Sequence, residues 1–120
     1  MAEDRRINEI TQINLEMAGG CNLRCVMCRQ SAGREEDFLR RLPLREFYKI
    51  IDQAIPMGLK YVNLSGSGEP LLHTQLEKAV RYLSDRGLVS MIYTNGTLLT
   101  PERFERLCIA GLSICKVSCM

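Results

Sequence analysis

Three cysteines stand close together in the segment CNLRCVMC, at positions 21, 25 and 28. In a chain without an export signal, clustered cysteines bind metal or do chemistry more often than they form disulfides. Structural zinc sites and ordinary ferredoxin clusters need four protein ligands, and Cys21, Cys25 and Cys28 supply three. A four-iron cluster held by three thiolates keeps one iron open to a small chelating molecule. The array therefore predicts an iron–sulfur cluster with an open iron.

The three remaining cysteines keep a four-thiolate site open as an alternative. Cys108 lies on the apolar stripe of a predicted helix, so we expect it in the core. Cys115 and Cys119 are four residues apart on a predicted strand, which separates their Cα atoms by roughly 13 Å and hinders joint binding of one metal. They share a strand face with Val117, which fits packing against helices. Approach of either one to the array would complete a zinc or iron site.

A second candidate site follows the predicted strand at residues 61–65. It consists of Gly66, Ser67, Gly68, Glu69 and Pro70. Glycines let a ligand approach the backbone closely, and the carboxylate of Glu69 can meet an ammonium group. The alternative is a simple turn between a strand and a helix.

Two more polar positions and a single histidine complete the candidates. Asn95 lies in a Thr-Asn-Gly string at the end of a predicted strand, where Asn-Gly is a turn signal in its own right. Ser118 lies at the end of the last predicted strand. His73 has no partner in the sequence pattern, so we expect a surface or capping residue rather than a catalytic one.

The elements that position these residues alternate between strands and helices. The strands are predicted at residues 10–17, 61–65, 88–93 and 112–119. Helices of about ten residues between strands are typical of βαβ units, so the fold class is α/β with a parallel sheet. All the candidate residues then follow strands, at the edge of the sheet where α/β proteins bind ligands.

Helix boundaries follow from caps and breakers. The first helix begins near Pro43 and ends at Pro56 and Gly58. Thr74 and Glu77 have the spacing of a capping box for the second helix. Thr100 with Pro101 opens the third, whose apolar stripe is predicted to contain Phe104, Leu107 and Cys108.

Composition excludes several classes of protein. The 16 Lys and Arg residues nearly balance the 14 Asp and Glu residues. This net charge of +2 does not support nucleic-acid binding. The N-terminal residues contain no apolar run long enough for a signal peptide or a membrane span. A cytoplasmic location without membrane contact is the default expectation.

The cysteine array and its place after the first strand resemble the radical S-adenosylmethionine (radical SAM) superfamily, whose hallmark is C-x3-C-x2-C in that loop of a partial (β/α)6 barrel. The resemblance runs from Ile10 to Met120 and matches the first four of six strand–helix units. It implies that the three cysteines bind a [4Fe-4S] cluster. It also implies that residues 66–70, similar to the family's GGEP motif with Ser67 in place of the first glycine, hold the amino group of S-adenosylmethionine.

The same resemblance assigns further cofactor contacts. Met27 stands where the family often has an aromatic residue against the adenine, and it can make an apolar contact without stacking. Asn95 belongs to a string found at the barrel mouth in several branches. Ser118 falls near the expected ribose position, although Met120 stands where members often have an aspartate.

The implied reaction begins when the reduced cluster gives one electron to the sulfonium of S-adenosylmethionine. The bond to C5′ breaks, and the 5′-deoxyadenosyl radical removes a hydrogen atom from a substrate. Gly68 and Glu69 would orient the amino group, and no general acid, base or nucleophile is identifiable. A reductant such as flavodoxin or ferredoxin is the implied partner. The strings CNLRCVMC, GSGEPLL and TNGTLL are similar to the branch with C-terminal auxiliary-cluster (SPASM-type) domains, which suggests a peptide or protein substrate.

Residues 1–120 are expected to form a radical SAM core domain truncated after its fourth strand, because no helix follows to cover that strand. Three other functions stay open. The chain could be an iron–sulfur electron carrier that binds no S-adenosylmethionine, a zinc-stabilised module, or a catalytically inactive fragment. The GSGEP string argues against a plain electron carrier, which needs no such ligand cradle.

Overall fold

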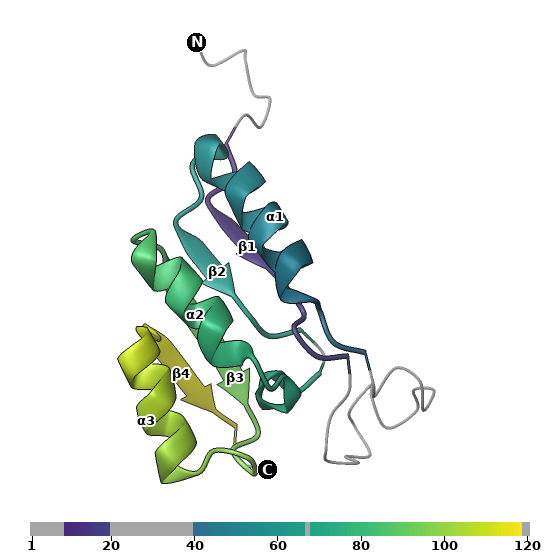
Figure 1. The fold of residues 1–120 in the computed structure, drawn as a ribbon, viewed down its shortest axis with the longest axis vertical. Coiled ribbons are helices and arrows are strands. Elements are labelled where there is room, and N and C mark those ends of the chain that lie inside the picture. Colours follow the sequence, from purple (N-terminus) through teal and green to yellow (C-terminus); the bar gives the residue numbers. More distant parts are fainter. Residues whose placement is uncertain (1–8, 20–39, 67, 119–120) are drawn as a thin grey trace.

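Four parallel strands form the sheet of the protein, for which a computed structural model describes residues 9–19, 40–66 and 68–118. They are β1 (Gln12–Asn14), β2 (Tyr61–Asn63), β3 (Val89–Thr94) and β4 (Ile114–Val117), and they lie side by side in chain order. Every neighbouring pair is parallel, and all four arrows point toward one end of the sheet (Figure 1). The predicted α/β fold is therefore confirmed, with β1, β2 and β4 shorter than their predicted ranges and β3 shifted by one residue.

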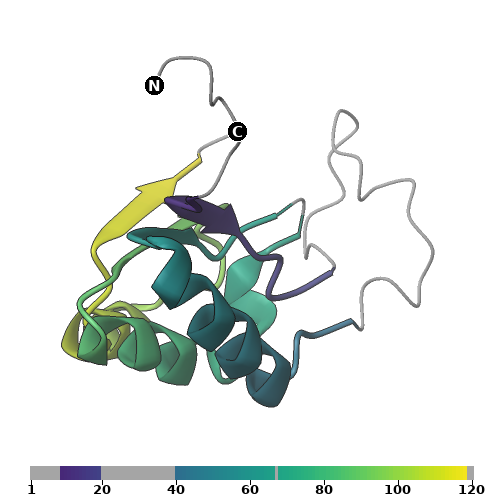
Figure 2. The ribbon, with the colours of Figure 1, turned by 90° about the horizontal axis from the view of Figure 1, so that it is seen from above.

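Three α-helices cover one face of this sheet (Figure 2). They are α1 (Leu44–Ala54), α2 (Leu76–Asp85) and α3 (Pro101–Ala110), and two 3-10 helices, η3 (Ile55–Met57) and η4 (Pro70–Leu72), precede β2 and α2. The core lies between helices and sheet, where Phe47, Val62, Leu83 and Ile92 are fully buried. Its apolar burial is the main favourable contribution to the stability of this layer.

Helix α1 buries one amphipathic face. Phe47, Ile51 and Ala54 are buried at the spacing i, i+4, i+7. Pro43 occupies the N-cap position in an extended conformation, and Gly58 stands after η3 with a φ of +100°, in the left-handed region that favours glycine. The predicted breakers thus end the helix where the chain turns toward β2.

The predicted capping box of the second helix is wrong. Helix α2 begins at Leu76, and its N-cap Gln75 makes no side-chain cap. Glu77 instead accepts a hydrogen bond from Arg103 of α3, with 2.7 Å between Nε and Oε2. A partner on another helix has taken the carboxylate that a local cap would have used. The predicted cap of α3 is confirmed, because the Thr100 hydroxyl accepts from the Arg103 backbone N–H at 3.1 Å.

The prediction that Cys108 lies in the core is also wrong, because its side chain is exposed on α3. The buried face of α3 is centred on Leu107 and Ala110, and Phe104 is exposed too. Arg103 supplies the reason: its guanidinium reaches across to α2 and η4, so this side of the helix faces the protein and the predicted stripe is rotated outward.

None of the helices in the described ranges is long and apolar enough to cross a membrane.

Candidate functional site

The turns after β2 and β3 lie next to each other at one end of the sheet. The two strands are parallel neighbours, with Tyr61 beside Val89 and Asn63 beside Met91. Because parallel strands end at the same edge, the turn at residues 66–70 meets the turn at residues 94–96 there. This is the edge where α/β proteins bind ligands.

Glu69 connects the two turns. It is only 2% exposed. Its Oε2 accepts hydrogen bonds from the Thr94 hydroxyl at 2.7 Å and from the Leu71 backbone N–H at 3.0 Å, and its Oε1 accepts from the Asn95 backbone N–H at 2.8 Å. A buried carboxylate needs such donors because it has lost its contacts with water. Two strings that the sequence presented as separate motifs therefore form one hydrogen-bonded unit.

The Thr94–Gly96 turn is held by its own side chains as well. The Thr94 hydroxyl oxygen accepts from the Gly96 N–H at 3.1 Å, and Gly96 has a φ of +83°. The Asn95 side-chain oxygen accepts from the N–H and the hydroxyl of Thr97, at 2.9 and 2.7 Å. The predicted turn is confirmed, and the Asn95 oxygen has a structural role within it.

Glu16, which the sequence reasoning missed, joins β1 to the same edge. Its Oε1 accepts a hydrogen bond from the Gly68 N–H at 2.9 Å. A Cβ added to Gly66 would lie 2.7 Å from the Cβ of Glu16, so glycine is needed at position 66 for this close approach. The only sequence signal for Glu16 is its polar type at the end of an alternating strand, which also describes many surface residues.

The cysteine segment itself, residues 20–39, lies outside the described residues, but the residues that flank it meet. The Gly19 N–H donates to the Arg40 carbonyl at 2.8 Å, and the Leu42 N–H donates to the Met17 carbonyl at 2.9 Å. Met17 is fully buried. Since Glu16 contacts the turn at residues 66–70, the residues that flank the cysteine segment lie near that turn.

A hollow of about 350 Å³ adjoins the base of this segment. Its lining includes Glu16, Gly19, Arg40 and Arg41. The size falls within the range of small-molecule sites. The hollow therefore offers space for a ligand beside Glu16 and the residues that flank the cysteine segment.

The other predicted contacts take different positions. Pro70 is buried and opens η4. Ser118 is exposed, and its N–H donates to the Thr94 carbonyl at 2.8 Å, which puts it beside the second turn. Ser67 and Met27 lie outside the described residues.

His73 is buried, with 4% exposed, so the predicted surface position is wrong. The predicted capping role is confirmed, because His73 is the C-cap residue of η4. Its Nδ1 accepts from the Gln75 N–H at 3.1 Å. Its Nε2 therefore carries the proton and donates to the Leu42 carbonyl at 2.7 Å. This pair of bonds ties the chain that leaves the cysteine segment to the start of α2.

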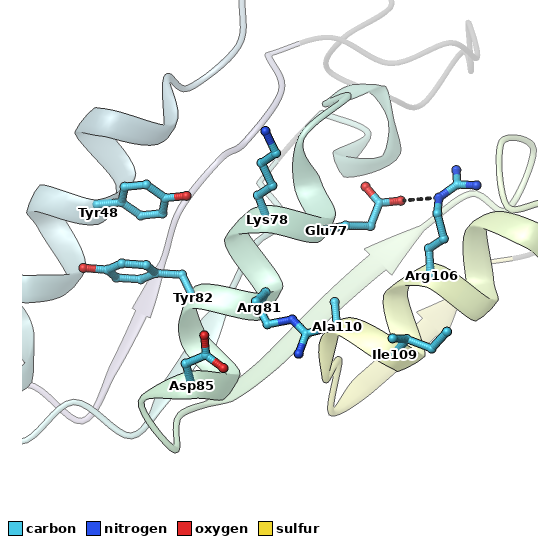
Figure 3. A pocket seen from close by; sticks show the side chains of 9 residues that line it. All are labelled: Tyr48, Glu77, Lys78, Arg81, Tyr82, Asp85, Arg106, Ile109 and Ala110. Atoms are coloured by element: carbon cyan, nitrogen blue, oxygen red, sulfur yellow. Dashed lines mark ion pairs between the residues drawn. The ribbon is translucent and has the colours of Figure 1, made fainter.

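A larger hollow of about 540 Å³ lies on the outer surface of the helices (Figure 3). Its lining includes the stacked rings of Tyr48 and Tyr82, whose centroids are 4.1 Å apart, and Ile109 of α3. The Tyr82 hydroxyl donates to Asp52, and this hydrogen bond raises the pKa of Tyr82 above its ordinary value. None of the predicted site residues lines this hollow.

A protein-family model described as the radical SAM superfamily matches residues 15–118. The chain belongs to the radical SAM superfamily. Members of this superfamily use a [4Fe-4S] cluster and S-adenosylmethionine. The matched range includes the cysteine array and both turns.

Relatives of this radical SAM chain are named as enzymes or as a cofactor-modifying protein. The AdoMet-dependent heme synthase of Methanosarcina barkeri is 41% identical over 103 residues, which cover 86% of this chain and 29% of that protein. A probable GTP 3′,8-cyclase of Methanococcus maripaludis is 32% identical over 116 residues, covering 97% of this chain and 38% of that protein. The chain thus spans about a third of the length of these relatives.

The fold has a solved counterpart. The crystal structure of BtrN in complex with AdoMet and 2-DOIA matches with a TM-score of 0.78, covering 92% of this chain and 46% of that one. The sequences are 23% identical, so this likeness concerns the fold.

The residues of this radical SAM chain fit the two groups that the family uses. Three thiolates are suitable ligands for an iron–sulfur cluster. In the described part of the chain, no three His, Cys, Asp or Glu side chains gather into a metal site. Near the residues that flank the cysteine segment lies a glycine-containing turn, which Glu16 approaches closely.

Proposed function

We propose that this chain binds a [4Fe-4S] cluster through Cys21, Cys25 and Cys28, and S-adenosylmethionine at the adjoining edge of the sheet, as part of a radical SAM enzyme. One observation supports the proposal: the residues that flank the cysteine segment meet near the turn at residues 66–70, which Glu69 joins to the turn at residues 94–96. Cluster ligands and cofactor cradle would then face the same small region.

When both groups are bound, they supply reductive cleavage of S-adenosylmethionine to a 5′-deoxyadenosyl radical that takes a hydrogen atom from the substrate. The protein contributes binding and orientation. The three thiolates would hold the cluster, and the backbone of residues 66–70 would receive the amino group. Met27 would lie against the adenine, with Asn95 and Ser118 at the rim.

The substrate class is a separate part of the proposal. The motif strings suggest a peptide or protein, whereas the names of the relatives mention heme, GTP and the cofactor of a tungsten-containing oxidoreductase. A substrate screen must therefore include both peptides and small molecules. We also propose a flavodoxin or ferredoxin as reductant and a cytoplasmic location, since free thiolate ligands need a reducing compartment.

The ligand assignment is tested by iron content after anaerobic reconstitution with iron and sulfide. Cys21→Ala, Cys25→Ala and Cys28→Ala are each expected to lose the cluster, because two thiolates do not retain it. Cys108→Ala is the matched control: it also removes one thiol, and its side chain is exposed on α3. Full iron retention in all three array variants would refute the assignment, and iron loss in the control would indicate a fourth ligand.

Three further readouts separate this function from its alternatives. Zinc in the purified protein, without visible absorption, would favour a zinc-stabilised module. A cluster whose properties do not respond to S-adenosylmethionine would favour an electron carrier. Formation of 5′-deoxyadenosine with a strong reductant would exclude an inactive fragment.

A further inference from the structure

The buried carboxylate of Glu69 is the only link that joins the two turns through a side chain among the contacts described above. We infer that Glu69 is a positioning residue, which locks the turn at residues 94–96 to the turn at residues 66–70 instead of contacting the cofactor's ammonium group with its carboxylate. The cofactor half of this inference rests on the proposed function. The lock itself rests on the geometry of the chain.

The three donors to Glu69 leave the carboxylate committed to the protein. Leu71 lies in η4, directly after the first turn, whereas Thr94 and Asn95 belong to the second turn. The donor–acceptor distances of 2.7 to 3.0 Å are those of well-formed hydrogen bonds. Bonds to a carboxylate are about twice as strong as bonds between neutral groups. The lock is therefore one of the stronger polar links at this edge.

The Thr94 hydroxyl extends the lock by one more bond. It donates to Glu69 Oε2 and accepts from the Gly96 N–H. Glu69 thus acts directly on the Asn95 backbone and, through Thr94, on Gly96. These groups lie in the turn whose Asn95 the family resemblance places at the cofactor.

Burial separates Glu69 from a carboxylate that would bind a ligand. A ligand's ammonium group needs surface to contact, and Glu69 exposes 2% of its area. The exposed carboxylate at this edge belongs to Glu16, which holds the Gly68 N–H. In this arrangement the first turn receives an amino group through its backbone, and Glu69 keeps the second turn in register with it.

The lock is tested first by amide hydrogen exchange in the protein without cofactor. Glu69→Gln replaces one acceptor oxygen with an NH₂ group, so at least one of the three donors loses its partner. Exchange at Asn95 and Gly96 is expected to accelerate about tenfold or more, as loss of a hydrogen bond to a charged group implies. Thr94→Val keeps the side-chain shape and removes the hydroxyl, so amide exchange at Gly96 should accelerate in the same way. This variant also tests the lock if Glu69→Gln does not fold.

The matched control for exchange is Asp52→Asn, which makes the same carboxylate-to-amide change on the outer face of α1, where the side chain accepts from the Tyr82 hydroxyl. It should leave exchange at residues 94–97 unchanged. Unchanged exchange at these residues in both lock variants would overturn the inference.

The second readout is the affinity of the reconstituted protein for S-adenosylmethionine. If Glu69 is a positioning residue, Glu69→Gln and Thr94→Val should each lower the affinity for S-adenosylmethionine several-fold. The double variant should then bind about as tightly as the single variant with the lower affinity, because both substitutions break the same lock. Loss of binding in Glu69→Gln with unchanged binding in Thr94→Val and unchanged exchange would instead indicate direct contact with the ammonium group. A wild-type protein that forms no cluster would contradict the proposed function, while the exchange result would still decide the lock.

Discussion

The centre of the sheet and its β4 edge carry similar residues in very different surroundings. In β2 and β3, Val62 and Ile92 are fully buried under the helices, and the adjoining Glu69 has three hydrogen-bond donors. On β4, Ile114 and Val117 are 39% and 53% exposed. Both regions are β-branched and parallel, so residue type alone does not set burial. What differs is the number of neighbours that cover each strand in the described part of the chain.

This difference bears on function, because the candidate site uses the centre. The carboxylate of Glu69 can be buried after β2 because it accepts hydrogen bonds from the end of β3 and from the Leu71 N–H of η4. The β4 edge supplies Ser118 on an exposed strand end, bound to the centre through one backbone hydrogen bond. We therefore expect substitutions in β2 and β3 to lower the stability of the protein and to disturb the candidate site. Substitutions in β4 should have a small effect on both.

The largest contrast is expected between two isoleucines. Ile92→Ala should lower the free energy of unfolding by about 2–5 kcal/mol, because it opens a cavity in a fully buried position. Ile114→Ala, the same change on β4, should cost about 1 kcal/mol or less, since its side chain is partly in water. Urea unfolding measures both, with the m-value as a check on two-state behaviour. Equal losses would remove the distinction between centre and edge.

The next contrast concerns two arginines of α3 that both approach Glu77. The Arg103 side chain is 15% exposed and also donates to the carbonyls of Leu71 and His73 at 2.8 Å. The Arg106 side chain is 60% exposed and pairs only loosely, at 3.5 Å. Arg103→Met should destabilise by about 2–3 kcal/mol, because half-buried acceptors lose a charged donor. Arg106→Met should cost at most about 0.5 kcal/mol. The two urea midpoints measure the difference, and a greater loss at Arg106 would contradict the described packing.

The smallest expected effect concerns the reactivity of two thiols. Burial raises the pKa of Cys115 above its ordinary value, and the nearby Cys108 thiol adds to the shift. Less thiolate is then present at Cys115 at a given pH, and Cys108 is exposed. Iodoacetamide should therefore alkylate Cys108 first at neutral pH, and raising the pH through the folded-state pKa should narrow the difference. Peptide mass spectrometry over a time course measures the alkylation rates of the two thiols. Faster alkylation of Cys115 would contradict the partial burial of its side chain on β4.

Local sequence patterns predicted the order of elements, because hydrophobic periodicity, the helix-starting residues Pro43 and Thr100 and the helix-ending Gly58 act over a few residues. They failed where a distant partner decided the outcome. Glu77 and Arg103 are 26 residues apart, and their contact overrode both the predicted capping box and the predicted stripe of α3.

The candidate site divides in the same way. The turns at residues 66–70 and 94–96 were visible as glycine-containing strings, and the family match includes both. The bond between Glu69 and Asn95 was not visible, because it depends on β2 and β3 being paired neighbours. Glu16 was missed for the same reason: a polar residue at a strand end acquires a role only when the strand beside it is known.

The most direct test of the account is electron paramagnetic resonance of the reduced, anaerobically reconstituted protein, recorded with and without S-adenosylmethionine. We predict a cluster signal that changes when S-adenosylmethionine is added, because one iron of a three-thiolate cluster is open to its amino and carboxylate groups. A cluster signal that stays the same, or no cluster signal at all, would contradict a radical SAM site in this chain.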